Sequence, residues 1–401
     1  MPSRTASAGC CAEYCSVNRR PPRIVLVAGE ASGDALGASL ARQLKQQDPD
    51  IELAGVAGEA MRDSGVTGWF DLDELNVMGL TEVLRHLPRL FRFRRKLRQR
   101  ILEWQPDAFV GIDAPDFNLR LARQLRRRGL RTVQYVAPTV WAWRPGRAAS
   151  VARSTDLLLT LFPFEPALFR AHGLASRFVG HPLADEIASL PRLLDGRKSK
   201  TGQGNRIVLL PGSRRGEIER HAELLAETAG WLRQHRPALG LTMLLAREAH
   251  RELIDRLVGE PLRQAGVEVV CAQTREGLAE ADAAVSASGT ATLEAFLLEC
   301  PLVVYYRLAP ATYWLLRGLR LVRSQFIALP NILQGRALVP EFVQQQARPE
   351  ALGREALAWI DDSGRLAAYQ AAAKRCRREL AAGASKNAAS ALLDLIHHDH
   401  R

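Results

Sequence analysis

Short apolar runs alternate with helical patterns along most of the chain, and this alternation constrains the fold more than any other feature. The runs typical of buried parallel strands are residues 24–28, 107–112, 132–136, 156–161, 207–210, 241–245, 267–270, 282–286 and 302–306. Amphipathic helical patterns lie between most of them. Apolar strands that alternate with helices indicate a doubly wound α/β protein, whose parallel sheets are covered by helices on both faces.

The alternation is interrupted around residues 190–205, where Gly, Lys and Ser dominate. A chain of 401 residues is also long enough for two cores. Ligands in such sheets bind at the carboxyl ends of the strands, so two facing sheets would place the site in the cleft between them. We therefore predict a disordered extension at 1–21, a Rossmann-like domain at 22–187, a linker at 188–205, a second Rossmann-like domain at 206–345 and a helical tail at 346–401.

Composition favours a soluble cytoplasmic protein. Hydrophobic residues make up 47% of the chain and charged residues 24%, which is ordinary for a globular protein. The six cysteines show neither a disulfide framework nor a metal-binding spacing, which favours a reducing compartment. No secretory signal is visible in residues 1–20, and no apolar run reaches the roughly 20 residues that span a bilayer.

The net charge of +12 is concentrated in residues 85–100, which hold eight Arg or Lys and no acid. A helix begun at Pro88 would place Leu90, Phe93, Leu97, Ile101 and Trp104 on one apolar stripe and leave Phe91 among the arginines. A solvated face on a packed helix is one interpretation, and an anionic membrane surface is the other. The motifs and aromatic platforms of nucleic-acid binders are absent, so we expect no nucleic-acid partner. The expected membrane contacts are Arg89, Phe91, Arg92, Arg94 and Arg95.

Two loops in the second half have the features of phosphate and ribose sites. In IVLLPGSRRGEI (207–218), a strand leads through Gly212 and Ser213 to Arg214 at a helix start, where backbone N–H groups and a guanidinium suit a diphosphate. An ordinary strand–helix turn with a surface arginine is the alternative.

The second of these loops is DAAVSASGTATLEAF (282–296). The predicted strand ends at Ser286–Ser288, Gly289 permits close backbone approach, and Thr290 opens a helix in which Glu294 could accept both hydroxyls of a ribose. A capped helix with a solvated glutamate is the alternative. Two such loops together indicate a nucleotide or nucleotide-sugar.

The first half carries acids where phosphate loops carry none. In IVLVAGEASGDALG (24–37), the glycines alone would suggest phosphate, but Glu30 and Asp34 would each repel a pyrophosphate about 4 Å away by roughly 4 kcal/mol at an effective dielectric near 20. Carboxylates accept well from neutral hydroxyls, so this loop favours a sugar. VGIDAPDFN (110–118) adds Asp113, a candidate general base or helix cap, and Asp116, for which capping is favoured.

No metal site is expected. The DLD at 71–73 begins what reads as a helix through Leu72, Leu75 and Met78, so we interpret it as a cap and not as a metal-binding pair. Nothing else has metal-ligand spacing, and His181 in VGHPLAD is as readily structural as functional.

These motifs, in this order, resemble one known family: the lipid-A-disaccharide synthases, inverting glycosyltransferases of the two-Rossmann-domain GT-B fold. The resemblance runs from about residue 23 to residue 395, and residues 1–21 have no counterpart. It rests on LVAGEASGD, GVAG, NVMGL, FVGIDAPDFN, YVAPTVWAWR, FPFE, FVGHPLAD, LLPGSRRGE, SASGTATLE and FIALPNILQGR.

The resemblance implies a metal-free hexosyltransferase that joins UDP-2,3-diacylglucosamine to 2,3-diacylglucosamine 1-phosphate through a β-1,6 linkage and releases UDP. Asp113 would deprotonate the acceptor 6-hydroxyl, Arg214 would bind the diphosphate, Glu294 would hold the ribose and Asn331 would line the donor site. Contacts to the acceptor or sugar would come from Glu30, Ser32, Asp34, Asp116 and Trp141. Trp141 and Trp143 could instead simply pack.

The acylated substrates imply a peripheral enzyme on the cytoplasmic face of the inner membrane of a Gram-negative-type bacterium. Residues 85–104 and 313–326 are the candidate lipid contacts. The family also suggests a homodimer with exchanged C-terminal helices. Two alternatives remain open: another GT-B enzyme, which would turn over unacylated UDP-N-acetylglucosamine, and a catalytically silent lipid- or nucleotide-binding module.

Overall fold

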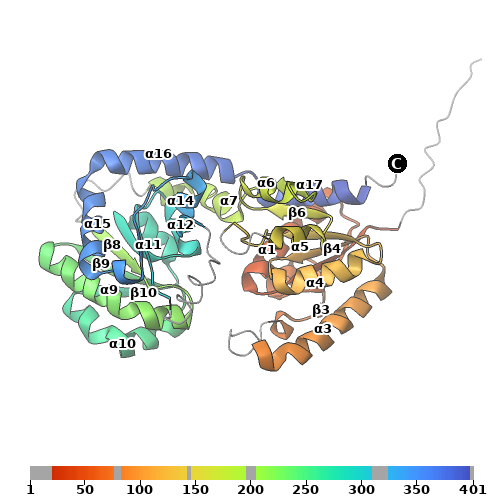
Figure 1. Ribbon diagram of the computed structural model, residues 1–401, viewed down its shortest axis with the longest axis horizontal. Coiled ribbons are helices and arrows are strands. Elements are labelled where there is room, and N and C mark those ends of the chain that lie inside the picture. The colour runs from red at the N-terminus through yellow and green to blue at the C-terminus, as the bar shows by residue number, and fades with distance from the viewer. Residues whose placement is uncertain (1–19, 76–82, 142–145, 196–204, 309–323, 398–401) are drawn as a thin grey trace, which may run out of the picture.

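The computed structural model describes residues 20–75, 83–141, 146–195, 205–308 and 324–397, which form two lobes (Figure 1). The strands of the first sheet are β1 (Arg23–Ala28), β2 (Glu52–Val56), β3 (Thr67–Phe70), β4 (Ala108–Ile112), β5 (Arg131–Tyr135), β6 (Leu157–Thr160) and β7 (Ala175–Phe178). Those of the second sheet are β8 (Arg206–Leu210), β9 (Gly240–Leu245), β10 (Val267–Cys271), β11 (Ala283–Ala287), β12 (Leu302–Tyr306) and β13 (Glu341–Val343).

All described strand pairs are parallel, with the orders β3-β2-β1-β4-β5-β6-β7 and β10-β9-β8-β11-β12-β13. In each sheet the strand order reverses once, between β1 and β4 and between β8 and β11. Loops on the two sides of such a switch point diverge and leave a crevice at the carboxyl ends of the strands. The predicted doubly wound α/β fold is confirmed.

Helices cover both sheets, as the alternation of strands and helices predicts. In the first lobe they are α1 (Ala31–Gln47), α2 (Glu59–Asp63), α3 (Val83–Trp104), α4 (Pro115–Arg126), α5 (Arg147–Ala152) and α6 (Glu165–Arg170). α7 (Pro182–Ala188) and α8 (Pro191–Asp195) follow, and both pack against the core of the second lobe. In the second they are α9 (Arg215–His235), α10 (Arg251–Gln264), α11 (Thr274–Glu280), α12 (Thr290–Leu297) and α14 (Leu329–Gln334), followed by α15 (Pro349–Asp361), α16 (Ser363–Leu380) and α17 (Ala384–His397).

β1 shows why these strands are apolar throughout. Ile24 and Leu26 pack into the core on one face of the first sheet, and Val25 and Val27 pack into the core on the other. Successive side chains point to opposite faces of a strand, so a strand covered on both sides needs an unbroken apolar run.

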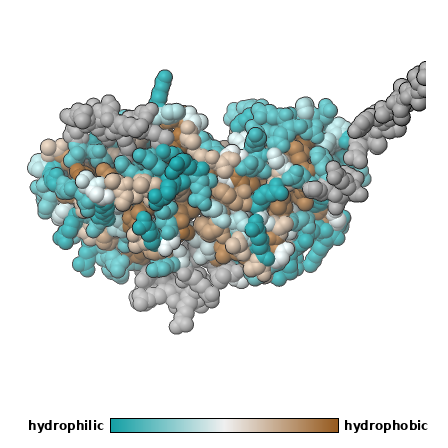
Figure 2. Space-filling model, turned by 90° about the horizontal axis from the view of Figure 1, so that it is seen from above, coloured by the Kyte–Doolittle hydropathy of each residue, from teal (hydrophilic) through white to brown (hydrophobic). Residues whose placement is uncertain are grey.

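The C-terminal helices cross between the lobes. α15 packs on α9, while α17 packs on α1, so that Ala388, Leu392 and Ile396 join the core of the first lobe. Figure 1 shows α16 running along one side of the molecule from the second lobe toward the first. Figure 2, which looks at the molecule from the side of α16, shows a notch between the two lobes at the upper edge of the outline.

Several local expectations are corrected. α3 begins at Val83 and not at Pro88. The segment predicted as a helix from DLD onward begins with a 3₁₀ turn, Leu72–Glu74, and its continuation to Met78 lies outside the described residues. Asp71 lies at its N-cap position but makes no capping bond; its carboxylate instead pairs with Arg62 at 2.5 Å. The proposed disordered extension lies almost wholly outside the described residues.

Candidate active site

The loops that follow β1 and β4 touch at the switch point of the first sheet. A Cβ placed on Gly29 would lie 2.3 Å from the Cβ of Ala114, so only glycine allows the two loops to approach this closely. Glu30 lies at the N-cap of α1, and Asp113 directly follows β4. The two acids predicted from separate motifs are thereby brought together.

Asp113 is held in an unusual environment. Its backbone φ is 51°, in the left-handed region, and its N–H donates to the carbonyl of Tyr135 at 2.9 Å. Burial, and after it the charge of Glu30, raises the pKa of the Asp113 carboxyl. Ala114 is the N-cap of α4, so Asp113 is not the helix cap that sequence alone left open. A carboxyl with a raised pKa at such a crevice is suited to accept a proton.

Glu30 and Ser32 are exposed beside it. The Ser32 hydroxyl donates to Glu30 Oε1 at 2.8 Å, and both residues lie where the turn after β1 leads into the first turn of α1. Their position agrees with the predicted role in hydroxyl binding, which stays a prediction.

The structure corrects the prediction that Asp34 contacts the sugar. Its side chain is only 6% exposed, and its carboxylate accepts the N–H groups of Gly58, Ala60 and Met61 at 2.8, 3.0 and 3.3 Å. Asp34 therefore caps α2 from another segment, and it has no oxygen directed at a sugar.

Asp116 and Trp141 also have partners within the protein. Asp116, in the first turn of α4, pairs with Arg147. The Trp141 indole donates to Glu165 Oε1 at 3.3 Å and meets Phe164 edge-on. Sequence reasoning missed Glu165, which is 2% exposed and whose pKa is raised by burial to about 7. Trp143 lies outside the described residues.

His181 is structural. Its Nδ1 accepts from the N–H of Leu183 at 3.2 Å and so caps α7, and burial lowers its pKa to about 4. α7 packs into the core of the second lobe through Ala184 and Ile187, although these residues fall within the range we assigned to the first. Phe162, after β6, joins the same core, so the carboxyl edge of the first sheet faces the second lobe there.

In the second sheet, the loop after β8 leads into α9. Gly212 has φ of 112°, and a Cβ there would lie 2.7 Å from Glu217 Oε2. That carboxylate accepts the N–H groups of Ser213 and Arg214 at 3.2 and 3.3 Å. Arg214 is the N-cap residue at the positive end of a 21-residue helix. Its side chain is 85% exposed, and its guanidinium lies 3.7 Å from Glu217 Oε1, so an anion bound here would compete with that carboxylate.

The loop after β11 lies beside it, because β8 and β11 are neighbouring strands. Gly289 and Thr290 are exposed, while the Ser288 hydroxyl is bound to the carbonyl of Ile327 at 2.7 Å. Glu294 is paired through Oε1 with Arg275 Nε at 2.8 Å. Arg275, another residue missed by sequence reasoning, also contacts Glu186 of α7 at 2.7 Å, so it ties Glu294 to the junction of the lobes.

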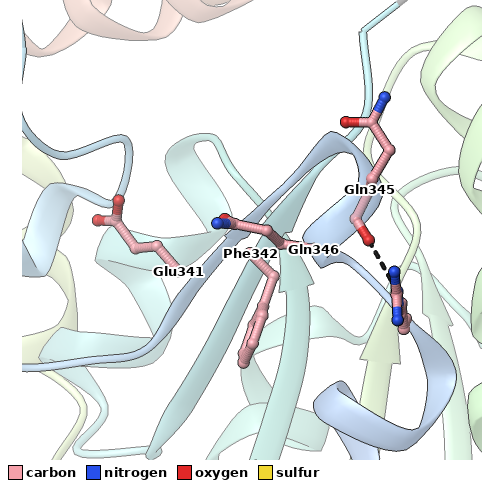
Figure 3. A pocket seen from close by; sticks show the side chains of 5 residues that line it. Glu341, Phe342, Gln345 and Gln346 are labelled. Carbon is pink, nitrogen blue, oxygen red and sulfur yellow. Dashed lines mark hydrogen bonds between the residues drawn. The ribbon is translucent and has the colours of Figure 1, made fainter.

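The structure also corrects the prediction that Asn331 lines the donor site. It is 1% exposed, its amide donates to Val339 O and Glu341, and its oxygen accepts from the N–H groups of Leu338 and Val339. The side chain therefore organises the loop before β13 and does not line a donor site. A cavity of about 490 Å³ opens nearby at β13, lined by Glu341, Phe342, Gln345, Gln346 and Arg348 (Figure 3). None of the predicted site residues lines it.

Comparison with known proteins identifies the family. A family model described as lipid-A-disaccharide synthetase matches residues 24–396. The chain belongs to the lipid-A-disaccharide synthase family. As a member of that family it is a glycosyltransferase of lipid A biosynthesis.

Curated members of the lipid-A-disaccharide synthase family match over nearly the whole chain. The synthase of Xanthomonas oryzae pv. oryzae (strain MAFF 311018) is 44% identical over 381 residues, which cover 94% of this chain and 88% of that protein. The synthase of Chromohalobacter salexigens is also 44% identical, over 94% of this chain and 97% of that protein.

Solved structures support the fold. CalG4, the calicheamicin glycosyltransferase, matches with a TM-score of 0.58 at 15% identity and covers 96% of this chain and 100% of that one. The UDP-GlcNAc 2-epimerase from Neisseria meningitidis matches with a TM-score of 0.59 at 10% identity, covering 93% and 99%. The GT-B architecture expected for this synthase family is thus confirmed.

The basic helix of this synthase is α3. Phe93, Leu97 and Ile101 are buried in the first lobe, which confirms the predicted apolar stripe. Phe91 is 53% exposed, and Arg92 and Arg95 are exposed with it, while Arg89 pairs with Glu74 at 3.2 Å.

The structure corrects, too, the prediction that Arg94 contacts the membrane. It is only 9% exposed, its guanidinium lies 4.7 Å from the Phe91 ring centre, and burial together with Arg120 and Arg98 lowers its pKa. It is therefore not available as a direct lipid contact. Most of the other lipid candidate, residues 313–326, lies outside the described part of the chain. Within that part, no helix is long and apolar enough to cross a membrane, and no group of three or more His, Cys, Asp or Glu could hold a metal ion.

Proposed function

We propose that this enzyme condenses UDP-2,3-diacylglucosamine with 2,3-diacylglucosamine 1-phosphate to give the β-1,6-linked disaccharide 1-phosphate and UDP. Family membership supports the class of reaction. The observation that carries the mechanism is the position of Asp113, at the switch point of the first sheet beside Glu30, with a raised carboxyl pKa.

In the proposed step Asp113 acts as the general base. Its carboxylate takes the proton of the acceptor 6-hydroxyl as that oxygen attacks the anomeric carbon of the donor. The bond from the anomeric carbon to the UDP oxygen breaks, and UDP leaves with the electron pair. One displacement from the opposite face inverts the anomeric configuration, so an α-linked donor gives a β-linked product.

The developing charge on UDP would be met by Arg214 and the N-terminus of α9. Both are cationic or positively polarised, and a bound diphosphate would take the guanidinium and the N–H groups of Ser213 and Arg214 over from Glu217. We propose that these groups make a metal cofactor unnecessary, and that Glu294, held by Arg275, accepts the ribose hydroxyls. Turnover that persists in excess chelator would support the metal-free mechanism, and full loss that Mg²⁺ restores would contradict it.

The acyl chains of both substrates require access to a lipid surface. We propose that the enzyme works on the cytoplasmic face of the inner membrane of a Gram-negative-type bacterium, held there by the exposed residues of α3.

We also propose a homodimer in which the two partners exchange C-terminal helices. Light scattering on the purified protein tests the dimer.

The reaction itself is tested by incubating the enzyme with both lipid substrates and measuring the product by mass spectrometry. We expect the acylated disaccharide phosphate together with UDP. Asp113→Asn should lower turnover by at least about 10²-fold while UDP binding survives. Near-normal turnover by that variant would remove Asp113 from the role of base, and turnover of unacylated UDP-N-acetylglucosamine alone would contradict the substrate assignment.

A further inference from the structure

Two buried side-chain amides converge on the backbone carbonyl of Asp113. Asn118 of α4 donates to this oxygen at 2.9 Å, and Gln134 of β5 donates to it at 3.0 Å. Both side chains are completely buried, so they cannot contact a substrate. The sequence motif IDAPDFN contains Asn118, but neither residue has a part in the chemistry described above.

The same two amides tie together the ends of three strands. Asn118 also donates to Val27 O of β1 at 3.2 Å and to Ile112 O of β4 at 3.3 Å. Gln134 also donates to the carbonyls of Tyr135 and Val136, each at 3.3 Å. Every one of these acceptors lies at the carboxyl edge of the first sheet, next to the crevice.

The backbone at this edge is strained. Asp113, Ala114 and Val136 have φ values of 51°, 40° and 76°, a region that residues other than glycine rarely adopt. Such conformations persist only where the surrounding structure fixes them, and they are concentrated at functional sites. The donors of Asn118 and Gln134 reach the carbonyls of Asp113 and Val136 and so supply that constraint.

The oxygens of the two buried amides lower the stability of the fold. Among the described residues, no group donates to Asn118 Oδ1 or Gln134 Oε1, although both atoms are buried. A buried acceptor without a partner is unfavourable. Gly111 makes room for the pair, because a Cβ there would lie 2.7 Å from Asn118 Cβ and 2.9 Å from Gln134 Oε1.

We propose that Asn118 and Gln134 are positioning residues, which hold the left-handed backbone of Asp113 so that its carboxylate stays in the crevice beside Glu30. This inference rests on the proposed function of Asp113 as the base. A misplacement of about 1 Å in a reacting group can cost on the order of 10²-fold in rate. Loss of either amide should therefore slow the chemical step without weakening nucleotide binding.

The test uses Gln134→Met and Asn118→Leu, which keep the approximate side-chain shape and remove the donors. Thr155→Val is the matched control: Thr155 is fully buried and donates to the carbonyls of Thr132 and Leu157, but it lies at the amino edge of the same sheet. The readouts are kcat, KM for the donor, UDP affinity by calorimetry, and the pH profile of kcat/KM.

We expect kcat to fall about 10- to 100-fold in both amide variants, with KM and UDP affinity changed less than about 3-fold. The acidic limb of the profile should move to lower pH, because a carboxyl that leaves its buried position beside Glu30 loses the two causes of its raised pKa. Thr155→Val should change neither kcat nor the limb.

Unchanged kcat in folded amide variants, or an equal fall in Thr155→Val, would overturn the proposal. A fall in kcat without a shift of the acidic limb of kcat/KM would also overturn the proposal, since it would indicate a merely structural role. If Gln134→Met or Asn118→Leu does not fold, Gln134→Ala and Asn118→Ala receive the same measurements and the same criteria. Asp113→Asn separates the two claims: if its turnover is normal the proposed function fails, whereas if only the amide variants are normal the positioning role fails.

Discussion

At the scale of single residues, the neighbours of a carboxylate decide its role. Asp34 and Asp113 belong to similar-looking acidic motifs that follow neighbouring strands, Asp34 in the first turn of α1 and Asp113 directly after β4. Asp34 is closed off by N–H groups 24 to 27 residues away in sequence, whereas the Asp113 carboxyl is left in the crevice with a raised pKa. The sequence shows which residues are acids, but it does not show which distant backbone groups will bond to them. The same reason explains the wrong prediction for Asn331.

Glu30→Gln tests the coupling between the two acids of the first lobe. The charge of Glu30 raises the pKa of Asp113, so its removal lowers that pKa, and the base stays deprotonated to more acidic conditions. We expect the acidic limb of kcat/KM to move to lower pH but not back to that of a free carboxyl, because burial, the larger cause, remains. A limb that stays in place or moves up in a pH titration of the variant would show that the two acids are not coupled.

Glu165 makes a prediction about stability. Its pKa rises from 4.5 to about 7 on folding, so the folded state binds its proton more tightly and the wild type loses stability as pH rises through this interval. The Glu165→Gln variant has no ionisable group at this position, so its stability does not fall in this way as pH rises. Relative to the wild type, the variant should gain up to about 3 kcal/mol between pH 4.5 and pH 7.5, measured as a difference in thermal midpoint at each pH. A difference independent of pH would contradict the burial of an ionisable Glu165.

At the scale of helices and strands, prediction from sequence succeeded where burial on both faces imposes an apolar run. It missed β2, β3, β7 and β13. β2 (Glu52–Val56) is buried except at its first residue, so exposure does not explain why it was missed, whereas the residues of β7 and β13 do show a reason. β7 (Ala175–Phe178) alternates exposed and buried positions at a sheet edge, and β13 (Glu341–Val343) has only three residues. The start of α3 was misplaced because proline is favoured in a first turn, while here Pro88 lies inside the helix.

The exposed face of α3 predicts electrostatic membrane binding. Arg92→Gln combined with Arg95→Gln should weaken binding to vesicles that contain anionic lipid, by about 1 kcal/mol for each lost charge, and added salt should release the wild type. The control changes two exposed arginines of α10, Arg256 and Arg263, to Gln. Equal losses in both pairs, or binding insensitive to salt, would shift the anchor elsewhere.

At the scale of the whole molecule, the chain leaves the first lobe through α7 and returns to it through α17. Asp185 of α7 joins these two crossings, because its carboxylate accepts the N–H groups of Gly383 and Ala384 at 2.9 and 2.7 Å. Nothing in the local sequence around Asp185 indicates a cap for a helix that begins almost 200 residues later. A tail exchanged between partners would require the same contact, made with the other chain.

Asp185→Ala should therefore loosen the tail. We expect a loss of about 1–2 kcal/mol and faster amide exchange in residues 384–397, since the N-terminus of α17 loses its cap. Asp394→Ala removes only an exposed pair with Arg177 and should leave exchange nearly unchanged. Protection of α17 that survives in Asp185→Ala would mean that packing on α1 alone holds the helix.

We propose that the two lobes bind different substrates: the second sheet binds the nucleotide, and the first sheet binds the acceptor and carries the base. A crystal structure of the enzyme with bound UDP would show which lobe holds the nucleotide. We expect the diphosphate against Gly212, Ser213 and Arg214 at the N-terminus of α9, with the ribose at Glu294. A diphosphate bound instead against Gly29–Gly33, beside Glu30, would contradict it.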